Sequence, residues 1–129
     1  MTPKTHLAID PRLVGAPLEL GEGSASAFLV TTPEMAADER GLVHGGFVFG
    51  LADYAAMLAV NDPNVVLGGA ETRFLKPVRV GERLEARARI EETDGRKSRV
   101  KVEVLRDSEA VMTGTFSCFT LDRHVFDRP

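Results

Sequence analysis

Residues 43–60, VHGGFVFGLADYAAMLAV, are mostly apolar or small, and Asp53 is the one full charge among them. The segment has the length of a helix and stops before 61–64 (NDPN), because Pro63 cannot continue a helix. Nearly every face of this helix is apolar, so other parts of the protein must surround it. The apolar run 47–60 is too short for the ~20 residues that cross a bilayer. The chain is therefore expected to fold around one buried helix, with no membrane span.

The sequence after this helix predicts consecutive antiparallel strands. Residues 83–90 (RLEARARI) alternate between apolar and charged side chains, and residues 98–105 (SRVKVEVL) place valines on one face. The dipeptide Asp94-Gly95 between them is a strong hairpin signal, because both residues tolerate positive φ. Further strands are expected at 16–20, 24–31, 68–80 and 110–121. Short helical turns are expected at 10–15 and within 32–41.

This order predicts an α+β fold in which one helix lies against a long, curved antiparallel sheet of five to six strands. Residues 1–129 are expected to form a single domain, with residues 1–10 and 122–129 as flexible tails. One helix covers little of such a sheet, so dimerisation is a natural way to complete the core.

Composition excludes several classes of protein. The net charge is −3 and the Lys and Arg residues are scattered, which argues against a nucleic-acid partner. Cys118 is the single cysteine, so no intrachain disulfide can form and a reducing compartment is expected. Residues 1–10 (MTPKTHLAID) lack the apolar stretch of a secretory signal, which favours a cytoplasmic protein.

Two sequence blocks carry a family likeness that extends over residues 16–121. GLVHGGFVFGLAD (41–53) followed by RFLKPVRVGERLEARARI (73–90) resembles the hotdog-fold acyl-CoA thioesterases, specifically the phenylacetate-degradation-type subgroup. The resemblance implies a long helix wrapped by a curved sheet, a homodimer with one continuous sheet and often a dimer of dimers, or homotetramer. It implies hydrolysis of an acyl-CoA to free acid and CoA, with no cofactor.

Asp53 is the first candidate catalytic residue. Its neighbours at helical spacing are apolar or small, so no polar stripe exists for it to join, and burial of an unpaired carboxylate raises its pKa. From the residues alone, a structural carboxylate that caps or pairs with another element is an equal alternative. The resemblance implies a general base on water, or a nucleophile that forms a mixed anhydride, and the sequence leaves both open.

Gly45 and Gly46 open the helix, where free N–H groups and the helix dipole favour an oxyanion. A tight entry turn that needs small residues is the structural alternative. The resemblance implies that the Gly45 N–H polarises the thioester carbonyl. Gly45 and Asp53 are eight residues apart, or ~12 Å along a helix, whereas one reacting carbon needs both groups within ~3.5 Å. If both residues act, each site must combine Gly45 of one subunit with Asp53 of its partner.

Two residues before the helix are weaker candidates. His44 can contact substrate or can hold the loop through a hydrogen bond. Asp38 occupies a position where many members of the family carry an asparagine that orients substrate or water. An ionised aspartate cannot donate a hydrogen bond as asparagine does, which puts the rate and the substrate in doubt.

The remaining candidates concern substrate binding. Arg73, Lys76 and Arg79 can attract the phosphates of CoA, or they can belong to an ordinary solvated strand face. Phe47 and Met57, together with Phe49, Tyr54 and Phe74, are candidates for the acyl lining and equally for plain core. No spacing of His, Cys, Asp and Glu indicates a metal site, so no metal is expected.

Three functions are weighed for this sequence. An acyl-CoA thioesterase is the first, and a non-catalytic acyl-CoA-binding module is the second, favoured by Asp38. A hotdog-fold hydratase is the third, but the Asp–His pair typical of that class is not found. The acyl group and the thiol carrier, CoA or acyl carrier protein, are not fixed by the sequence.

Overall fold

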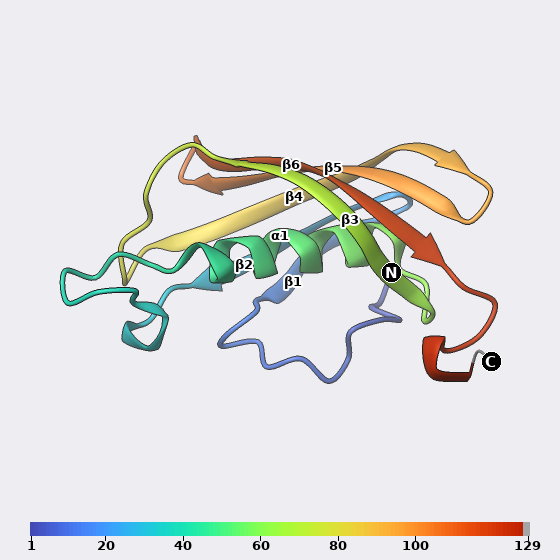
Figure 1. Ribbon diagram of the computed structural model, residues 1–129, viewed down its shortest axis with the longest axis horizontal. Helices are drawn as coiled ribbons and strands as arrows, with labels where there is room; N and C mark the ends of the chain where they lie inside the picture. Colours follow the sequence, from blue (N-terminus) through green and yellow to red (C-terminus); the bar gives the residue numbers. More distant parts are fainter. Residues whose placement is uncertain (128–129) are drawn as a thin grey trace.

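The computed structural model describes residues 1–127, and within them one α-helix lies against a six-stranded antiparallel sheet (Figure 1). The helix is α1 (Gly45–Val60), and two 3-10 turns are η1 (Pro33–Met35) and η2 (Val125–Asp127). The sheet order is β1-β2-β4-β5-β6-β3. The strands are β1 (Ala16–Gly21), β2 (Ser24–Val30), β3 (Val65–Phe74), β4 (Arg83–Asp94), β5 (Lys97–Arg106) and β6 (Glu109–Thr120). This arrangement is the hotdog fold, and it confirms the predicted α+β architecture.

The helix occupies the predicted position and is enclosed as its composition requires. Its buried residues are Val48, Leu51, Ala52, Tyr54, Ala55, Ala56, Met57, Leu58 and Ala59. The helix ends at Asn61, whose left-handed backbone (φ 51°) lets its N–H donate to the Met57 carbonyl at 2.8 Å. Figure 1 shows α1 running along one face of the curved sheet. None of the helices in residues 1–127 is long and apolar enough to cross a membrane.

The alternating strands bury the faces that their sequences indicate. On β4, Leu84 and Ala86 are fully buried, and on β5 Val100 and Val104 are fully buried. The charged residues between them face away from the helix. β6 lies between β5 and β3, and its buried Phe116 and Cys118 face the helix layer. The core is thus a single layer between the sheet and α1.

The third strand differs from its prediction at both ends. It was expected at 68–80 but is observed at Val65–Phe74. It begins earlier because the turn after the helix closes at once, with the Val65 N–H donating to the Asp62 carbonyl. It ends earlier because the chain leaves the sheet before Pro77, which has no N–H for a strand ladder. Residues 75–82 therefore form a separate connecting segment.

The hairpin between β4 and β5 is shifted by one residue from the expected turn. Asp94 pairs with Lys97, so Gly95 and Arg96 are the central turn residues. Gly95 adopts a positive φ of 60°, the backbone conformation that glycine tolerates best. Strand β4 consequently extends to Asp94, whereas the alternation of apolar and charged residues indicates a strand only over 83–90.

The N-terminal residues contact the end of the helix. The Lys4 N–H donates to the Asn61 side chain at 2.8 Å, and the Asn61 amide donates to the Thr2 carbonyl. Thr5 is buried, and the His6 ring lies near Tyr54. At the other end, residues 122–127 include η2, whereas residues 128–129 of the expected tail lie outside the described residues.

Strand β3 forms one edge of the sheet and is exposed on both faces. Ala70 pairs with Phe116, which is fully buried, and therefore lies on the face that carries the helix. Ala70 is nevertheless exposed, because α1 passes mainly under β2, β4 and β5. The helix therefore leaves the inner face of β3 uncovered in a single chain.

Candidate active site

The start of α1 presents backbone N–H groups from two glycines. His44 is the residue before the first turn, and the Phe47 N–H donates to the His44 carbonyl at 3.1 Å. Gly45 and Gly46 follow His44 at the positive end of the helix dipole, and α1 has no acidic residue in its first turn. An incoming carbonyl oxygen therefore meets an unneutralised helix terminus.

Both glycines also have a steric reason to be small. A Cβ on Gly45 would lie 3.3 Å from the Phe74 ring, and a Cβ on Gly46 would lie 3.0 Å from the His44 Nε2. Contacts of this length are tighter than ordinary side-chain packing. The glycine pair thus serves the tight entry turn, and the same small residues leave the N–H groups approachable.

A cavity of about 290 Å³ adjoins Gly45. Its lining residues are Val43, Gly45, Val48, Phe74, Leu75, Lys76, Pro77 and Val78. Among the predicted substrate-binding residues, Lys76 is at this cavity. One wall comes from the helix start and the other from the segment after β3, so the cavity lies where these two parts of the chain meet.

Asp53 lies two turns farther along the same continuous helix. Its Oδ1 is buried and finds no hydrogen-bond partner among residues 1–127. Burial raises the pKa of Asp53 to about 6. At ~1.5 Å per residue, the Gly45 amide and Asp53 are ~12 Å apart along α1. Asp53 is not among the residues of the Gly45 cavity, so a single chain does not bring the two groups together.

The surroundings of Asp53 are apolar on one side and open on another. Burial, and after it the charge of Asp53, raises the pKa of the Cys118 thiol to about 12, which places Cys118 within electrostatic reach of the carboxylate. A Cβ added to Gly50, one turn before Asp53, would meet nothing within 4 Å in the described chain. The carboxylate therefore sits at the border between the core and free space.

His44 and Asp38 have different local environments. The exposed His44 ring packs edge-on against Phe47, with 6.2 Å between ring centroids, and the His44 N–H donates to the Met35 carbonyl. The Asp38 Oδ1 accepts hydrogen bonds from the N–H groups of Arg40 (2.9 Å) and Leu42 (3.2 Å). Asp38 thus stabilises its own loop, whereas the His44 ring stands at the helix entrance.

The other predicted residues are dispersed. Arg73, Lys76 and Arg79 lie outside the core, and Arg73 pairs with Thr113 on β6. Phe47 is half-buried, and Met57 is fully buried in the core of the chain. No group of three or more His, Cys, Asp or Glu residues suited to a metal ion occurs in residues 1–127.

Sequence reasoning did not identify most of the cavity wall. Val43, Val48, Leu75, Pro77 and Val78 line it without having been singled out. The expected strand 68–80 would have placed residues 75–78 inside the sheet. Pro77 was the available signal, because a proline is disfavoured within a paired strand.

The comparisons with known proteins place these features in one family. Residues 40–113 match the thioesterase superfamily, a range that includes the helix entrance, Asp53 and Lys76. An uncharacterized protein from Pyrococcus horikoshii is 54% identical, with 98% of each chain covered and a TM-score of 0.97. A mutant of the phenylacetic acid degradation protein PaaI from Thermus thermophilus is 31% identical over 84% of this chain and 95% of that one, with a TM-score of 0.77.

Two curated relatives are longer than this chain. The protein named methylthioribose-1-phosphate isomerase from Aquifex aeolicus is 49% identical over 120 residues, which are 92% of this chain and 26% of that protein. Transcription factor FapR from Shouchella clausii is 33% identical over 102 residues, which are 79% of this chain and 53% of that protein. The chain therefore spans about a quarter of the first relative and about half of the second.

Proposed function

Because the chain belongs to the thioesterase superfamily, we propose that it hydrolyses an acyl-CoA thioester to free acid and CoA. The observation that carries this proposal is the buried Asp53 Oδ1, which lacks a hydrogen-bond partner within residues 1–127, on a carboxyl whose pKa is about 6. A carboxylate with this pKa is ionised near neutral pH and remains basic enough to accept a proton. A purely structural carboxylate would be expected to have its buried oxygen bonded.

The proposed site is shared between two subunits. The N–H of Gly45 in one subunit polarises the thioester carbonyl, and Asp53 of the partner subunit acts on the same carbon. The ~12 Å between these residues along one helix requires this arrangement if both take part. The exposed β3 edge supports it, because pairing of two β3 strands would extend the sheet and bring the partner subunit beside the inner face that α1 leaves open. A further pairing of dimers into a tetramer is compatible with this arrangement.

Two routes through Asp53 balance chemically. As a general base, Asp53 takes a proton from water, the hydroxide oxygen bonds to the carbonyl carbon, and the tetrahedral oxyanion is stabilised at Gly45. The C–S bond then breaks, its electron pair leaves with the CoA sulfur, and the proton held by Asp53 is released to the thiolate or to solvent. As a nucleophile, Asp53 itself bonds to the carbon and expels the CoA thiolate, and water then opens the mixed anhydride. Single turnover in ¹⁸O-water gives a one-way test. Label in the Asp53 carboxyl would show an anhydride opened at Asp53, whereas label in the product acid is expected from the base route and also from an anhydride opened at its acyl carbon.

The decisive experiment is a panel of acyl-CoA thioesters assayed with a chromogenic thiol reagent. Wild-type protein should release CoA from at least one of them, and Asp53→Asn should reduce kcat/KM by roughly 10²- to 10⁴-fold. Asp122→Asn is the matched control, because Asp122 is exposed and pairs only with Arg96 at 3.2 Å within the described chain. Turnover that survives Asp53→Asn would refute the proposed role of Asp53.

Substitution of Lys76, which lines the Gly45 cavity, tests whether the protein recognises the CoA part of the thioester. If Lys76 attracts the phosphates of CoA, Lys76→Ala should raise KM for an acyl-CoA and leave KM for the matching acyl-pantetheine unchanged. Arg73→Ala and Arg79→Ala extend the same comparison. Equal effects on both substrates would assign Lys76 to the acyl or thioester end.

A second candidate function is a non-catalytic acyl-CoA-binding module. Asp38 favours it, because its Oδ1 is engaged by the N–H groups of Arg40 and Leu42 and an ionised carboxylate cannot donate to substrate. The similarity to FapR, named as a transcription factor, points in the same direction. Calorimetric binding of an acyl-CoA that is not hydrolysed, at protein concentrations where turnover would be seen, would support this function over the first.

A further inference from the structure

The segment between β3 and β4 forms one wall of the Gly45 cavity and depends on a few specific bonds. Leu75, Lys76, Pro77 and Val78 contribute half of the cavity lining. The Leu75 N–H donates to the Val111 carbonyl at 2.8 Å, which fixes the start of the segment to β6. Pro77 has no N–H, so only its carbonyl can anchor the backbone at that point.

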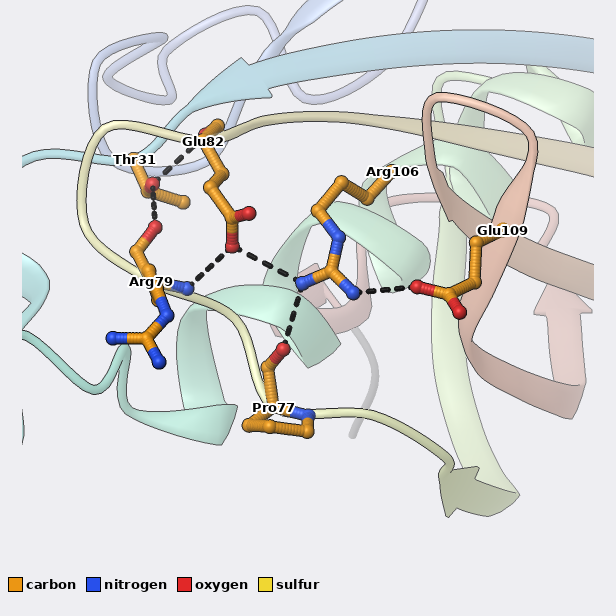
Figure 2. A network of polar contacts seen from close by, with 6 residues as sticks. All are labelled: Thr31, Pro77, Arg79, Glu82, Arg106 and Glu109. Atoms are coloured by element: carbon orange, nitrogen blue, oxygen red, sulfur yellow. Dashed lines mark hydrogen bonds and ion pairs between the residues drawn. The ribbon is translucent and has the colours of Figure 1, made fainter.

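Arg106, at the end of β5, supplies that anchor. Its Nη1 donates to the Pro77 carbonyl at 2.8 Å and to the Glu82 Oε1 at 3.1 Å, and its Nη2 donates to the Glu109 Oε1 at 2.6 Å. Figure 2 shows the guanidinium between the two carboxylates, with the Pro77 carbonyl below it in this view. Only 21% of the Arg106 side chain is exposed, so the contacts are partly shielded from water.

The same network fixes the far end of the segment. The Glu82 Oε1 also accepts the Arg79 N–H at 2.6 Å, and the Thr31 hydroxyl is within 3.0 Å of the Arg79 carbonyl and 2.8 Å of the Glu82 carbonyl. Figure 2 shows these bonds converging on the turn at 79–82. One guanidinium thus links the middle of the cavity wall to the turn that enters β4.

The wall is bonded in turn to the loop that leads into α1. The Val43 N–H donates to the Val78 carbonyl at 2.8 Å, and Val43 is two residues before Gly45. A displacement of Pro77 and Val78 would therefore move Val43 and the helix entrance. Within residues 1–127 the Arg106 side chain bonds to Pro77, Glu82 and Glu109 and not to Gly45. Any effect of Arg106 on the position of Gly45 must therefore pass through this backbone path.

We propose that Arg106 is a positioning residue, which sets the Gly45 amide and the facing cavity wall in the geometry needed to hold the thioester carbonyl. The inference rests on the proposed thioesterase function. The planar guanidinium donates in two directions at once, to a carbonyl and to two carboxylates, whereas a lysine ammonium lacks this fixed fork. Because misplacement of a reacting group by about 1 Å costs up to ~10²-fold in rate, a small shift of the wall would be measurable.

The test compares Arg106→Gln and Arg106→Lys with Arg87→Gln. Arg87 pairs with Glu85 at 2.7 Å on the outer face of β4 and does not line the Gly45 cavity, so it is a matched arginine–glutamate pair. At a temperature well below unfolding, Arg106→Gln should lower kcat/KM per folded molecule roughly tenfold. Arg106→Lys should recover part of this loss, and Arg87→Gln should change nothing. Glu109→Gln should have a smaller effect, because the bonds to Pro77 and Glu82 remain.

A second readout is independent of turnover. In ¹H–¹⁵N spectra, the amide resonances of Val43 and Gly45 should move in Arg106→Gln and in Arg106→Lys, but not in Arg87→Gln. Unmoved resonances in both Arg106 variants would overturn the proposal, as would moved resonances with unchanged kcat/KM. If wild type hydrolyses no thioester while the Arg106 variants show the resonance shifts, the proposed function is contradicted and the structural coupling is established.

Discussion

The Asp53 carboxylate on α1 and the Cys118 thiol on β6 interact across the layer between helix and sheet. Burial is the larger cause and the charge of Asp53 the smaller, and together they raise the pKa of Cys118 to about 12. Because the thiolate is the reactive form, the folded protein holds this cysteine in an inert state. The side chain is also fully buried, which limits access of any reagent.

The first prediction follows for thiol modification. With an aromatic disulfide reagent at pH 8, native protein should react extremely slowly, whereas protein unfolded in guanidinium should react with one equivalent. Asp53→Asn should lower the pKa of the thiol but leave the native reaction slow, because burial remains. Reaction of one equivalent with the native protein within the mixing time would contradict the buried position of Cys118.

The second prediction concerns stability as a function of pH. The folded-state pKa of Asp53 is about 6, above the ordinary value of 3.8, because burial disfavours the charged form. Between pH about 4 and 6 the unfolded chain ionises this carboxyl and the folded chain keeps its proton. The contribution of Asp53 to the free energy of unfolding therefore falls as pH rises through this window, by up to roughly 3 kcal/mol, and is constant above it.

Denaturant unfolding of wild type and Asp53→Asn at several pH values measures this pH dependence of the free energy of unfolding. The asparagine side chain does not titrate, so the variant should gain stability relative to wild type as pH rises from about 4 to 6. At pH 7 the variant should be the more stable protein. A constant difference between the two proteins over this range would show that the Asp53 carboxyl is not desolvated.

The third prediction is the pH dependence of the proposed hydrolysis. Asp53 must be ionised to act as base or as nucleophile, and its pKa is about 6. The logarithm of kcat/KM should therefore rise with a slope of about one at low pH and level off above about 6. Stopped assays from pH 4.5 to 8 measure it. A flat profile across pH 5–7 would exclude Asp53 as the titrating catalytic group.

The sequence was most informative where a residue conflicts with its local surroundings. Asp53 stands out because it is the one charge in an apolar helix, and the alternation in β4 and β5 identifies their buried faces directly. The cavity wall was missed because residues 75–78 belong to no periodic element. The network at Arg106 was missed because only Glu109 is near it in sequence, whereas Glu82 and Pro77 are 24 and 29 residues away, and such separations leave no local pattern.

The fourth prediction contrasts one substitution at two glycines. In Gly50→Ala the new methyl group meets nothing within 4 Å in the described chain, and a mid-helix glycine is less favourable than alanine. This variant should raise the free energy of unfolding by roughly 0.5–1 kcal/mol. In Gly68→Ala the Cβ would overlap the Phe119 ring, so the ring or strand must shift, at a cost of roughly 1–3 kcal/mol. Thermal melts should therefore move in opposite directions, and equal shifts of the same sign would contradict the local geometry.

The fifth prediction concerns the uncovered edge of the sheet. Ala70 lies on the inner face of β3 but is exposed, so a single chain tolerates a charge there, whereas a second chain paired along β3 would bury it. Ala70→Asp should retain the circular dichroism of wild type and reduce the molar mass measured by light scattering to that of one chain. Ala8→Asp is the matched control, because Ala8 is exposed and belongs to none of the six strands. If Ala70→Asp keeps a dimeric mass, the two chains associate through a surface other than β3. If wild type itself is a monomer, no site can combine Gly45 with Asp53 of the partner subunit.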